Sequence, residues 1–429
     1  MFRRMTAFLL GLLQSLLISQ GATTLWAHRT PAAQSRYPFV LVHGLMGYGY
    51  NDLINEVLPY WGQTTGDIPA VLAEQGYECY TASVGPLSSA WDRACELYAQ
   101  LAGGTVDYGA AHASLHGHSR FGRTYETPLF PGWGPERKVN LLGHSFGAAT
   151  IRLLACLLAE GDAGERAAAP DPSPLFEGGK GGWICSVTSL AGPHNGTAAL
   201  SQPETAPPAG ERRPGASDVL SALALRTIGN LPLGNAIYDF QLEQWGLTDP
   251  PLTLTKPTWT QRRQWLHFTA GTDNALYDLS LHGAYELNRR LFPVEEIYYF
   301  SFAAVKTNLE EATGDQIPEQ DLFFLFLPNA KQLGLHGTPW VSADGITIDE
   351  SWQPNDGLVP LASALYPFGE AHQDFSPGTA PDDLPAGVWL VMPVQHMDHL
   401  GFSGGFYNQN RGGLRLFYAE QFSLVEATY

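Results

Sequence analysis

Short, continuous hydrophobic runs recur along the chain, each bounded by glycine, proline or polar residues. They cover residues 37–42, 139–142, 183–190, 297–302 and 388–392, and each is typical of a buried strand. Helical stretches alternate with these runs. That alternation favours a mainly parallel sheet with helices on both faces. The pattern therefore predicts an α/β fold whose functional residues lie at the carboxyl ends of the strands.

One of these runs leads into a recognisable motif. Residues 139–142 are followed by Gly143-His144-Ser145-Phe146-Gly147 and then by a helical stretch at residues 148–158. A G-x-S-x-G sequence between a strand and a helix is typical of a nucleophile elbow. Its glycines allow a sharp backbone turn, which exposes the serine hydroxyl at the top of the sheet. Ser145 is therefore the predicted nucleophile.

Composition and charge limit the classes of partner. The chain has 429 residues, of which 44% are hydrophobic and 15% are charged, so it can hold one large domain or two ordinary ones and has material for a sizeable core. The formal net charge is −18. This argues against nucleic acid, since phosphate binding needs a basic surface. Any action on lipid should depend on apolar surface, because an acidic protein is not attracted to anionic lipid.

The first 27 residues have the layout of a secretory signal peptide. A basic start precedes an apolar run that is too short to span a membrane comfortably. Cleavage after Gly21 and cleavage after Ala27 both remain open. No other stretch is long and apolar enough to cross a bilayer. We therefore expect a secreted protein without a transmembrane anchor, in which residues 28–429 form a single domain.

Secretion makes disulfides possible, and the chain also carries one glycosylation sequon. Three pairings of the four cysteines are possible, although buried, inert thiols are the default expectation; the cysteines are Cys79, Cys95, Cys156 and Cys185. The sequon at Asn195 falls beside a predicted strand end at the active site, so we expect it not to be used.

A serine nucleophile needs a base, and the base needs an orienting carboxylate. In hydrolases built on this kind of elbow the order along the chain is Ser, then Asp or Glu, then His. Asp356 lies in the turn Asn355-Asp356-Gly357 and is the candidate acid. The alternative is an ordinary Asp-Gly turn without a catalytic role.

The candidate base lies near the end of the chain, in Gln395-His396-Met397-Asp398-His399-Leu400. His399 precedes a glycine-rich loop and is preferred, and His396 is the alternative. Asp398 is not expected to orient His399, because the side chains of adjacent residues on an extended segment diverge. A remote carboxylate such as Asp356 fits better.

The developing oxyanion needs two preorganised N–H donors. One is expected from the backbone of Phe146, the residue after the nucleophile. The other is expected from the loop after an early strand. The segment His43-Gly44-Leu45-Met46-Gly47 follows the first predicted strand, so the N–H of Leu45 is the candidate.

Beyond these motifs, the chain resembles the secreted bacterial lipases of the thermoalkalophilic Bacillus type and the staphylococcal lipases. The resemblance covers nearly the whole chain after about Tyr37. Its most specific blocks are residues 84–96, 103–112 and 116–125. Supporting blocks are residues 173–179, 238–240, 244–247 and 277–280.

This resemblance implies an α/β-hydrolase fold and a triacylglycerol lipase that acts on acylglycerols at an oil–water interface through an acyl-enzyme. It assigns the triad to Ser145, Asp356 and His399. It also implies a zinc-bearing insertion at about residues 92–125 and a helical lid at about residues 200–235. From the residues alone, an ordinary packed helix is the alternative to that lid.

The family carries a structural zinc ion bound by two aspartates and two histidines, and the resemblance assigns these ligands to Asp92, His112, His118 and Asp273. The residue types suit zinc, and four protein ligands close a structural site. The two histidines are six residues apart, which does not suit one helix face, so we expect a loop to present them. His116 is the spare histidine, and we expect it to be merely polar.

Two positions depart from the family pattern. Its bacterial members bind calcium through carboxylates after the catalytic histidine, but Gly401 and Phe406 stand at those positions here. Calcium needs several oxygen ligands, so we expect no calcium site of the family type. Phe146 replaces a glutamine and is expected to make the floor of the cleft more apolar.

Three other functions remain open. A carboxylesterase or a phospholipase would use the same residues and the same chemistry. A catalytically inactive binding protein on this fold is a third reading, because a fold does not determine a function. The retained Ser, Asp and His and both oxyanion positions argue against it.

Overall fold

The computed structural model describes residues 35–63, 65–200, 238–247, 258–376, 379–380, 383–405 and 411–429. The expected signal peptide and, apart from Leu200, the expected lid lie outside these residues, as does Phe406 of the calcium comparison. Among the helices of the described residues, none combines the length and the apolar character needed to cross a membrane.

A seven-stranded sheet forms the centre of the molecule, with the strand order β12-β13-β7-β6-β5-β1-β2. Every neighbouring pair in it is parallel. Its strands are β1 (Phe39–Val42), β2 (Cys79–Ala82), β5 (Val139–His144), β6 (Ile184–Leu190), β7 (Tyr298–Phe302), β12 (His372–Asp374) and β13 (Trp389–Val391). All five predicted strands are therefore confirmed.

The two edge strands, β2 and β12, were missed. Every residue of β12 is exposed, and three of the four residues of β2 are only half-buried. Edge strands need no continuous apolar run, because part of their surface faces water. The hydrophobic pattern therefore identified the interior of the sheet and not its edges.

The described part of the chain also contains twelve α-helices and three pairs of short strands. The helices are α2 (Leu53–Val57), α3 (Ile68–Glu74), α4 (Ala90–Ala102), α5 (Ala110–His116), α6 (Gly147–Glu160), α7 (Ala163–Ala168), α10 (Trp259–Ala270), α11 (Ala275–Asp278), α12 (Leu281–Asn288), α13 (Leu327–Gly334), α14 (Leu361–Leu365) and α15 (Arg411–Glu426). The paired strands are β3 (Gly104–Asp107) with β4 (Phe121–Tyr125), β8 (Thr307–Leu309) with β9 (Gln316–Pro318), and β10 (Trp340–Val341) with β11 (Thr347–Ile348).

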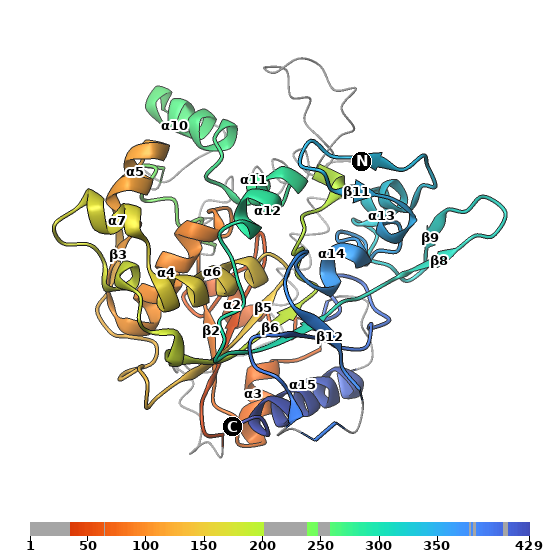
Figure 1. Cartoon of the computed structure of the whole chain (residues 1–429), viewed down its shortest axis with the longest axis horizontal. Coiled ribbons are helices and arrows are strands. Elements are labelled where there is room, and N and C mark those ends of the chain that lie inside the picture. The colour runs from red at the N-terminus through yellow and green to blue at the C-terminus, as the bar shows by residue number, and fades with distance from the viewer. Residues whose placement is uncertain are drawn as a thin grey trace.

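Alternation along the central strands creates a core on each face of the sheet. In β1, Val40 and Val42 join a cluster with residues of α4 and α6, whereas Phe39 and Leu41 join a second cluster with residues of α3 and α15. Figure 1 shows α3 and α15 together on one side and α4 and α6 on the other. The prediction of a parallel sheet with helices on both faces is confirmed.

The cysteines do not form disulfides. All four are free, and three of them are buried. Burial raises the pKa of the Cys156 thiol to about 12, which keeps it protonated and unreactive at neutral pH.

The sequon residue Asn195 is also buried, and its side-chain amide donates a hydrogen bond to the Tyr366 carbonyl oxygen at 2.9 Å. A buried, hydrogen-bonded amide does not accept a glycan in the folded protein.

Candidate active site

The predicted elbow is present between β5 and α6. Ser145 has a φ of 55°, the left-handed conformation that a nucleophile on a tight turn adopts. The flanking glycines are required by space: a Cβ on Gly143 would lie 2.5 Å from the Gly147 backbone, and a Cβ on Gly147 would lie 2.3 Å from the Val42 carbonyl oxygen. The turn therefore packs directly against the end of β1.

The loop after β1 passes over the nucleophile. A Cβ on Gly44 would lie 2.7 Å from the Cβ of Ser145 and 3.2 Å from its Oγ. Within the described part of the chain, neither the Leu45 N–H nor the Phe146 N–H donates a hydrogen bond to another residue. Both are the donors that the sequence predicted for an oxyanion.

The predicted acid and base form a buried pair. His399 Nδ1 donates a hydrogen bond to Asp356 Oδ2 at 2.8 Å, and both side chains are at least 96% buried. The other oxygen of the carboxylate, Oδ1, accepts the N–H groups of Leu358 and Val359 at 3.0 and 2.8 Å. The Asp356 carboxylate therefore both stabilises its own turn and holds the imidazole of His399.

The two alternative residues lie elsewhere. Asp398 accepts hydrogen bonds from the N–H groups of Phe323 and Leu400, and so it holds the loop and not the imidazole. The His396 side chain is 66% exposed and pairs with Glu319 at 3.2 Å. The His399 carbonyl oxygen lies 2.8 Å from Nε2 of His144, the residue before Ser145, so the Asp356–His399 pair and the nucleophile lie at the same edge of the sheet, where β5 ends.

Three buried side chains around this edge were not singled out from the sequence. The guanidinium of Arg93, on α4, donates to the carbonyl oxygens of His43 and Gly85 and to the Thr150 hydroxyl. Tyr60 and His144 lie hydrogen-bonded to each other beneath the nucleophile. No motif marks Arg93 or Tyr60, and His144 occupies a variable position of the G-x-S-x-G motif. The partners of all three come from segments that only the fold brings together.

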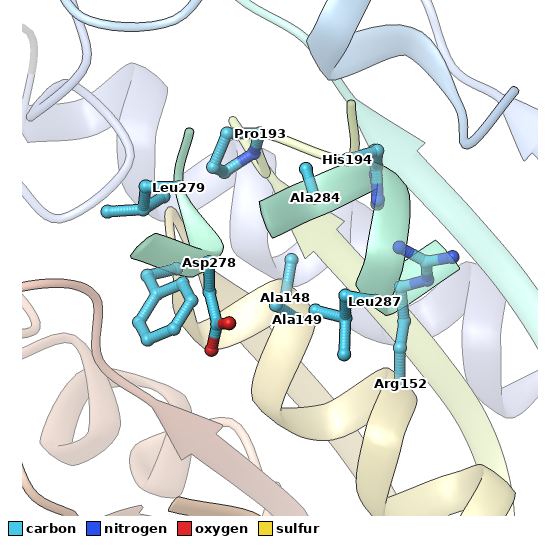
Figure 2. Close-up of a pocket in the computed structure, with 10 residues that line it drawn as sticks. Ala148, Ala149, Arg152, Pro193, His194, Asp278, Leu279, Ala284 and Leu287 are labelled. Carbon is cyan, nitrogen blue, oxygen red and sulfur yellow. The ribbon is translucent and has the colours of Figure 1, made fainter. Parts of the chain in front are cut away.

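The ring of Phe146 lies in the core and does not form a cleft floor. It is 1% exposed and packs with the guanidinium carbon of Arg93 at 5.0 Å from the ring centroid. The same side chain lines a cavity of about 10 Å³, which is shown in Figure 2. That volume suits one water molecule and not an acyl chain. The expectation of a more apolar cleft floor is therefore not met by this side chain.

Two titratable groups line the same cavity, the buried His194 and the partly buried Asp278 (Figure 2). Burial, with a further contribution from the charge of Arg152, lowers the pKa of His194 far below its usual range, and neither ring nitrogen has a hydrogen-bond partner. Burial raises the pKa of Asp278 to about 7, although its carboxylate accepts the N–H of Ala90 at 2.7 Å.

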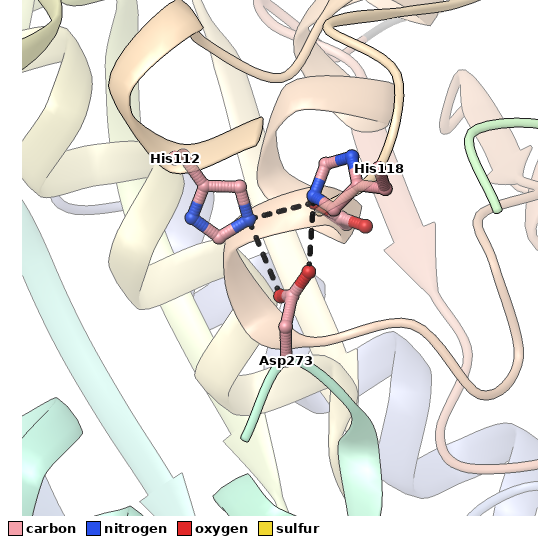
Figure 3. Close-up of side chains that lie close together, drawn as sticks. His112, His118 and Asp273 are labelled. Atoms are coloured by element: carbon pink, nitrogen blue, oxygen red, sulfur yellow. Dashed lines mark ion pairs between the residues drawn. The ribbon is translucent and has the colours of Figure 1, made fainter. Parts of the chain in front are cut away.

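A second group of polar side chains lies apart from the triad. One ligand atom from each of Asp92, His112, His118 and Asp273 lies within 4.8 Å of the other three. Asp273 bridges the histidines, with His112 Nε2 at 3.3 Å and His118 Nε2 at 3.1 Å, as Figure 3 shows. His112 Nε2 lies 3.2 Å from Asp92 Oδ1. All four residues predicted as metal ligands therefore converge.

Three separate segments supply these side chains. Asp92 lies in the first turn of α4, whose N-cap is Ser89. His112 lies on α5, and His118 follows Gly117, which ends that helix with a left-handed φ of 77°. The expectation that a loop presents both histidines is therefore wrong for His112. The left-handed glycine turns the chain back, so that His118 faces the same point.

The donor atoms are oriented as a cation requires. His118 Nδ1 donates to the Ser119 carbonyl oxygen at 2.9 Å, which leaves Nε2 directed at the cluster. Gln244 Nε2 donates to Asp92 Oδ2 at 2.8 Å. The facing atoms, namely Asp92 Oδ1, His112 Nε2, His118 Nε2 and both Asp273 oxygens, are buried without a hydrogen-bond partner. Such a set of unsatisfied buried ligand atoms fits a bound metal ion.

Comparisons with known proteins agree with this geometry. The family model described as "Lipase-like, C-terminal domain" matches residues 35–422. Lipase 1 of Staphylococcus aureus is 35% identical over 385 residues, which are 87% of this chain and 52% of that protein. The chain thus spans about half the length of the curated relatives it matches.

Solved structures show the same relationship. EstA from Clostridium botulinum is 35% identical with a TM-score of 0.77, and the match covers 94% of this chain and 89% of that one. Staphylococcus hyicus lipase is 30% identical with a TM-score of 0.77 and coverages of 93% and 98%. The resemblance to the staphylococcal lipases and the α/β-hydrolase fold are both confirmed. The chain belongs to the lipase-like, C-terminal domain family.

Proposed function

We propose that this chain is a triacylglycerol lipase that hydrolyses the carboxylic ester bonds of acylglycerols. One observation carries the proposal: a buried Asp356–His399 pair stands at the edge of the sheet that also holds a serine at φ 55°. A serine on an elbow, a histidine base and an orienting carboxylate are the parts of an acyl-transfer site. Membership of the family supports the same chemistry.

The first half of the reaction forms an acyl-enzyme. Ser145 Oγ attacks the ester carbonyl carbon while His399 Nε2 takes the hydroxyl proton. Asp356 stays ionised, holds the ring through Nδ1 and stabilises the imidazolium. The Leu45 and Phe146 N–H groups receive the negative charge that develops on the carbonyl oxygen. His399 then gives its proton to the departing alcohol oxygen.

The second half returns the enzyme to its starting state. A water molecule gives a proton to His399 and attacks the acyl carbon, and the same two N–H groups stabilise the second oxyanion. The fatty acid leaves and Ser145 regains its proton. Since the serine is part of a positive-φ turn held by a 2.8 Å bond from its N–H to the Leu190 carbonyl oxygen, its position is set before the substrate arrives.

We also propose that Asp92, His112, His118 and Asp273 hold a structural zinc ion. Two carboxylates and two imidazoles suit zinc, and four protein ligands leave no open position for a catalytic water. When bound, the ion would join α4, α5 and the segment before α11. Its charge would balance two aspartates, both at most 3% exposed, that otherwise lie together in the interior.

The substrate class rests on the family and on the charge. A net charge of −18 favours neutral acylglycerols over anionic lipids at the interface. Esterase and phospholipase activities use the same residues. Hydrolysis of short-chain esters, long-chain triglycerides and phospholipids by wild type and Ser145→Ala tests the proposal. Long-chain triglyceride hydrolysis that vanishes in the variant is expected, and a short-chain preference would favour the esterase.

A covalent probe separates the enzyme from an inactive binding protein. An organophosphonate should label wild type at Ser145 and leave Ser145→Ala unlabelled, because only an activated serine reacts. A wild type that is not labelled would favour the inactive scaffold.

Secretion belongs to the same proposal. Residues 1–27 are proposed as the signal peptide, and the N-terminal sequence of the protein recovered from the culture medium tests this assignment.

A further inference from the structure

A chain of three hydrogen bonds runs beneath the candidate active site. The Gly44 N–H lies 3.0 Å from Tyr60 Oη, Tyr60 Oη lies 2.6 Å from His144 Nδ1, and His144 Nε2 lies 2.8 Å from the His399 carbonyl oxygen. We infer that Tyr60 and His144 are positioning residues that align the oxyanion loop and the base with the nucleophile. This inference rests on the proposed function.

The direction of every bond in this chain follows from its chemistry. The His399 carbonyl oxygen can only accept, so His144 Nε2 carries the hydrogen. A neutral imidazole then presents Nδ1 as an acceptor, and so the Tyr60 hydroxyl donates to it. The Tyr60 oxygen in turn accepts the Gly44 N–H. With a neutral imidazole each group therefore has one role, and no second arrangement satisfies all three bonds.

The neutral state that this arrangement needs is maintained by burial. His144 is 1% exposed, and burial, with a further contribution from His399, lowers its pKa to about 3. Burial also raises the pKa of Tyr60 above its usual range. The charged or titratable groups that face the two side chains include Arg93, His399, His43 and Tyr48. The tautomer is therefore unchanged across the neutral and alkaline range.

The groups at the two ends of this series of hydrogen bonds explain why the series matters for catalysis. Gly44 is bonded covalently to Leu45, the proposed oxyanion donor, and His144 is bonded to Ser145. The third contact is the backbone of His399, the proposed base. The loops after β1, β5 and β13 carry these groups, and no covalent link near the site joins them. Catalytic groups must be held within about 0.5 Å, and a 1 Å displacement can cost about a hundred-fold in rate.

Two substitutions test the two halves of this series of hydrogen bonds separately. Tyr60→Phe removes only the hydroxyl, so the Gly44 N–H and His144 Nδ1 both lose their partner. His144→Asn retains an acceptor near Nδ1 but loses the donor to the His399 carbonyl oxygen. Tyr299→Phe is the matched control, because its buried hydroxyl also accepts a backbone N–H, from Val294 at 2.9 Å, but lies on β7 away from this chain.

The measurements are kcat and KM on a soluble p-nitrophenyl ester, together with the rate and final extent of phosphonate labelling of Ser145. We expect Tyr60→Phe and His144→Asn each to lower kcat and the labelling rate ten- to a hundred-fold, with KM changed less than about two-fold and labelling still complete. Tyr299→Phe should keep the wild-type kcat at a similar loss of thermal stability.

The double variant supplies the decisive comparison. Because the two residues belong to one chain, Tyr60→Phe with His144→Asn should lower kcat little more than the worse single variant. Multiplying effects, or a kcat for Tyr60→Phe within two-fold of Tyr299→Phe, would overturn the inference. A wild type that is not labelled at all would instead refute the proposed function, so the two failures are distinguishable.

Discussion

His399 contacts Asp356 twice, once through its ring and once through its backbone. Its Nδ1 lies 2.8 Å from Asp356 Oδ2, and its N–H lies 2.8 Å from the Asp356 carbonyl oxygen. The two residues are 43 positions apart in the sequence. The second bond fixes the backbone of the base, so that the first determines only the rotation of the ring.

This double contact makes Asp356→Asn a clean substitution. The backbone bond remains, and the amide keeps the size of the carboxylate, so the fold should be retained. The amide does not stabilise the imidazolium and favours the wrong tautomer, and so kcat for ester hydrolysis should fall by about ten-thousand-fold. Asp398→Asn is the control, since that carboxylate accepts only backbone N–H groups. Equal losses in both variants would contradict the assignment of the acid.

Gly44→Ala tests the close approach of the oxyanion loop to the nucleophile. The new Cβ would lie 2.7 Å from Ser145 Cβ and 3.1 Å from the His144 carbonyl oxygen. Overpacking of this kind costs about 1–3 kcal/mol, and here it also displaces the oxyanion donor. Chemical denaturation and ester hydrolysis should both report the loss.

Gly182→Ala serves as the reference for that variant. A Cβ at Gly182 meets no atom within 4 Å, so we expect a change in unfolding free energy within about 0.5 kcal/mol and full activity. If Gly44→Ala behaves in the same way, the loop does not lie where the structure places it.

Metal removal should destabilise the protein without altering the triad. A ligand present at a thousand times its Kd stabilises the folded state by about 4 kcal/mol, and its loss would leave Asp92 and Asp273 close together and buried. A chelator should therefore lower the midpoint of thermal unfolding, and added zinc should restore it. Mass spectrometry of the purified protein should find one zinc ion per chain.

The histidines beside the cluster provide a matched pair of variants. Asp92→Ala combined with His118→Ala should abolish zinc binding. His116→Ala should retain it, because His116 is not among the converging ligands although its ring lies 4.5 Å from that of His112. An unchanged zinc content in the double variant would rule out this site.

The buried His194 predicts a pH-dependent loss of stability. Its pKa is lowered in the folded state, so below about pH 6.5 the unfolded chain binds a proton that the folded chain does not. His194 therefore costs no stability at neutral pH. As the pH falls below about 6.5, it lowers the free energy of unfolding by about 1.4 kcal/mol per pH unit.

His194→Gln removes that proton uptake. We expect the difference in unfolding free energy between wild type and variant to move in favour of the variant as the pH falls from 6.5 to 4.5, measured by urea denaturation. The comparison cancels the opposite contribution of Asp278, whose raised pKa is common to both proteins. Parallel pH profiles would show that the imidazole is already protonated in the fold.

The amino-acid sequence by itself determined the features that depend on neighbouring residues. Five apolar runs identified the buried strands, and Gly143 and Gly147 marked the turn at Ser145, because strand burial and tight turns leave local signals. The resemblance assigned each of the four metal ligands to a residue of this chain, and the structure brings all four together.

Only the tertiary structure shows the contacts between segments that lie far apart in the chain. Asp398 is adjacent to His399 in the sequence and Asp356 is 43 positions away, yet the fold places the carboxylate of Asp356 at the imidazole ring. The exposed edge strand β12 and the Tyr60–His144 bond also lacked any local signal. Both depend on contacts between segments far apart in the chain, and such contacts form only when the sheet assembles.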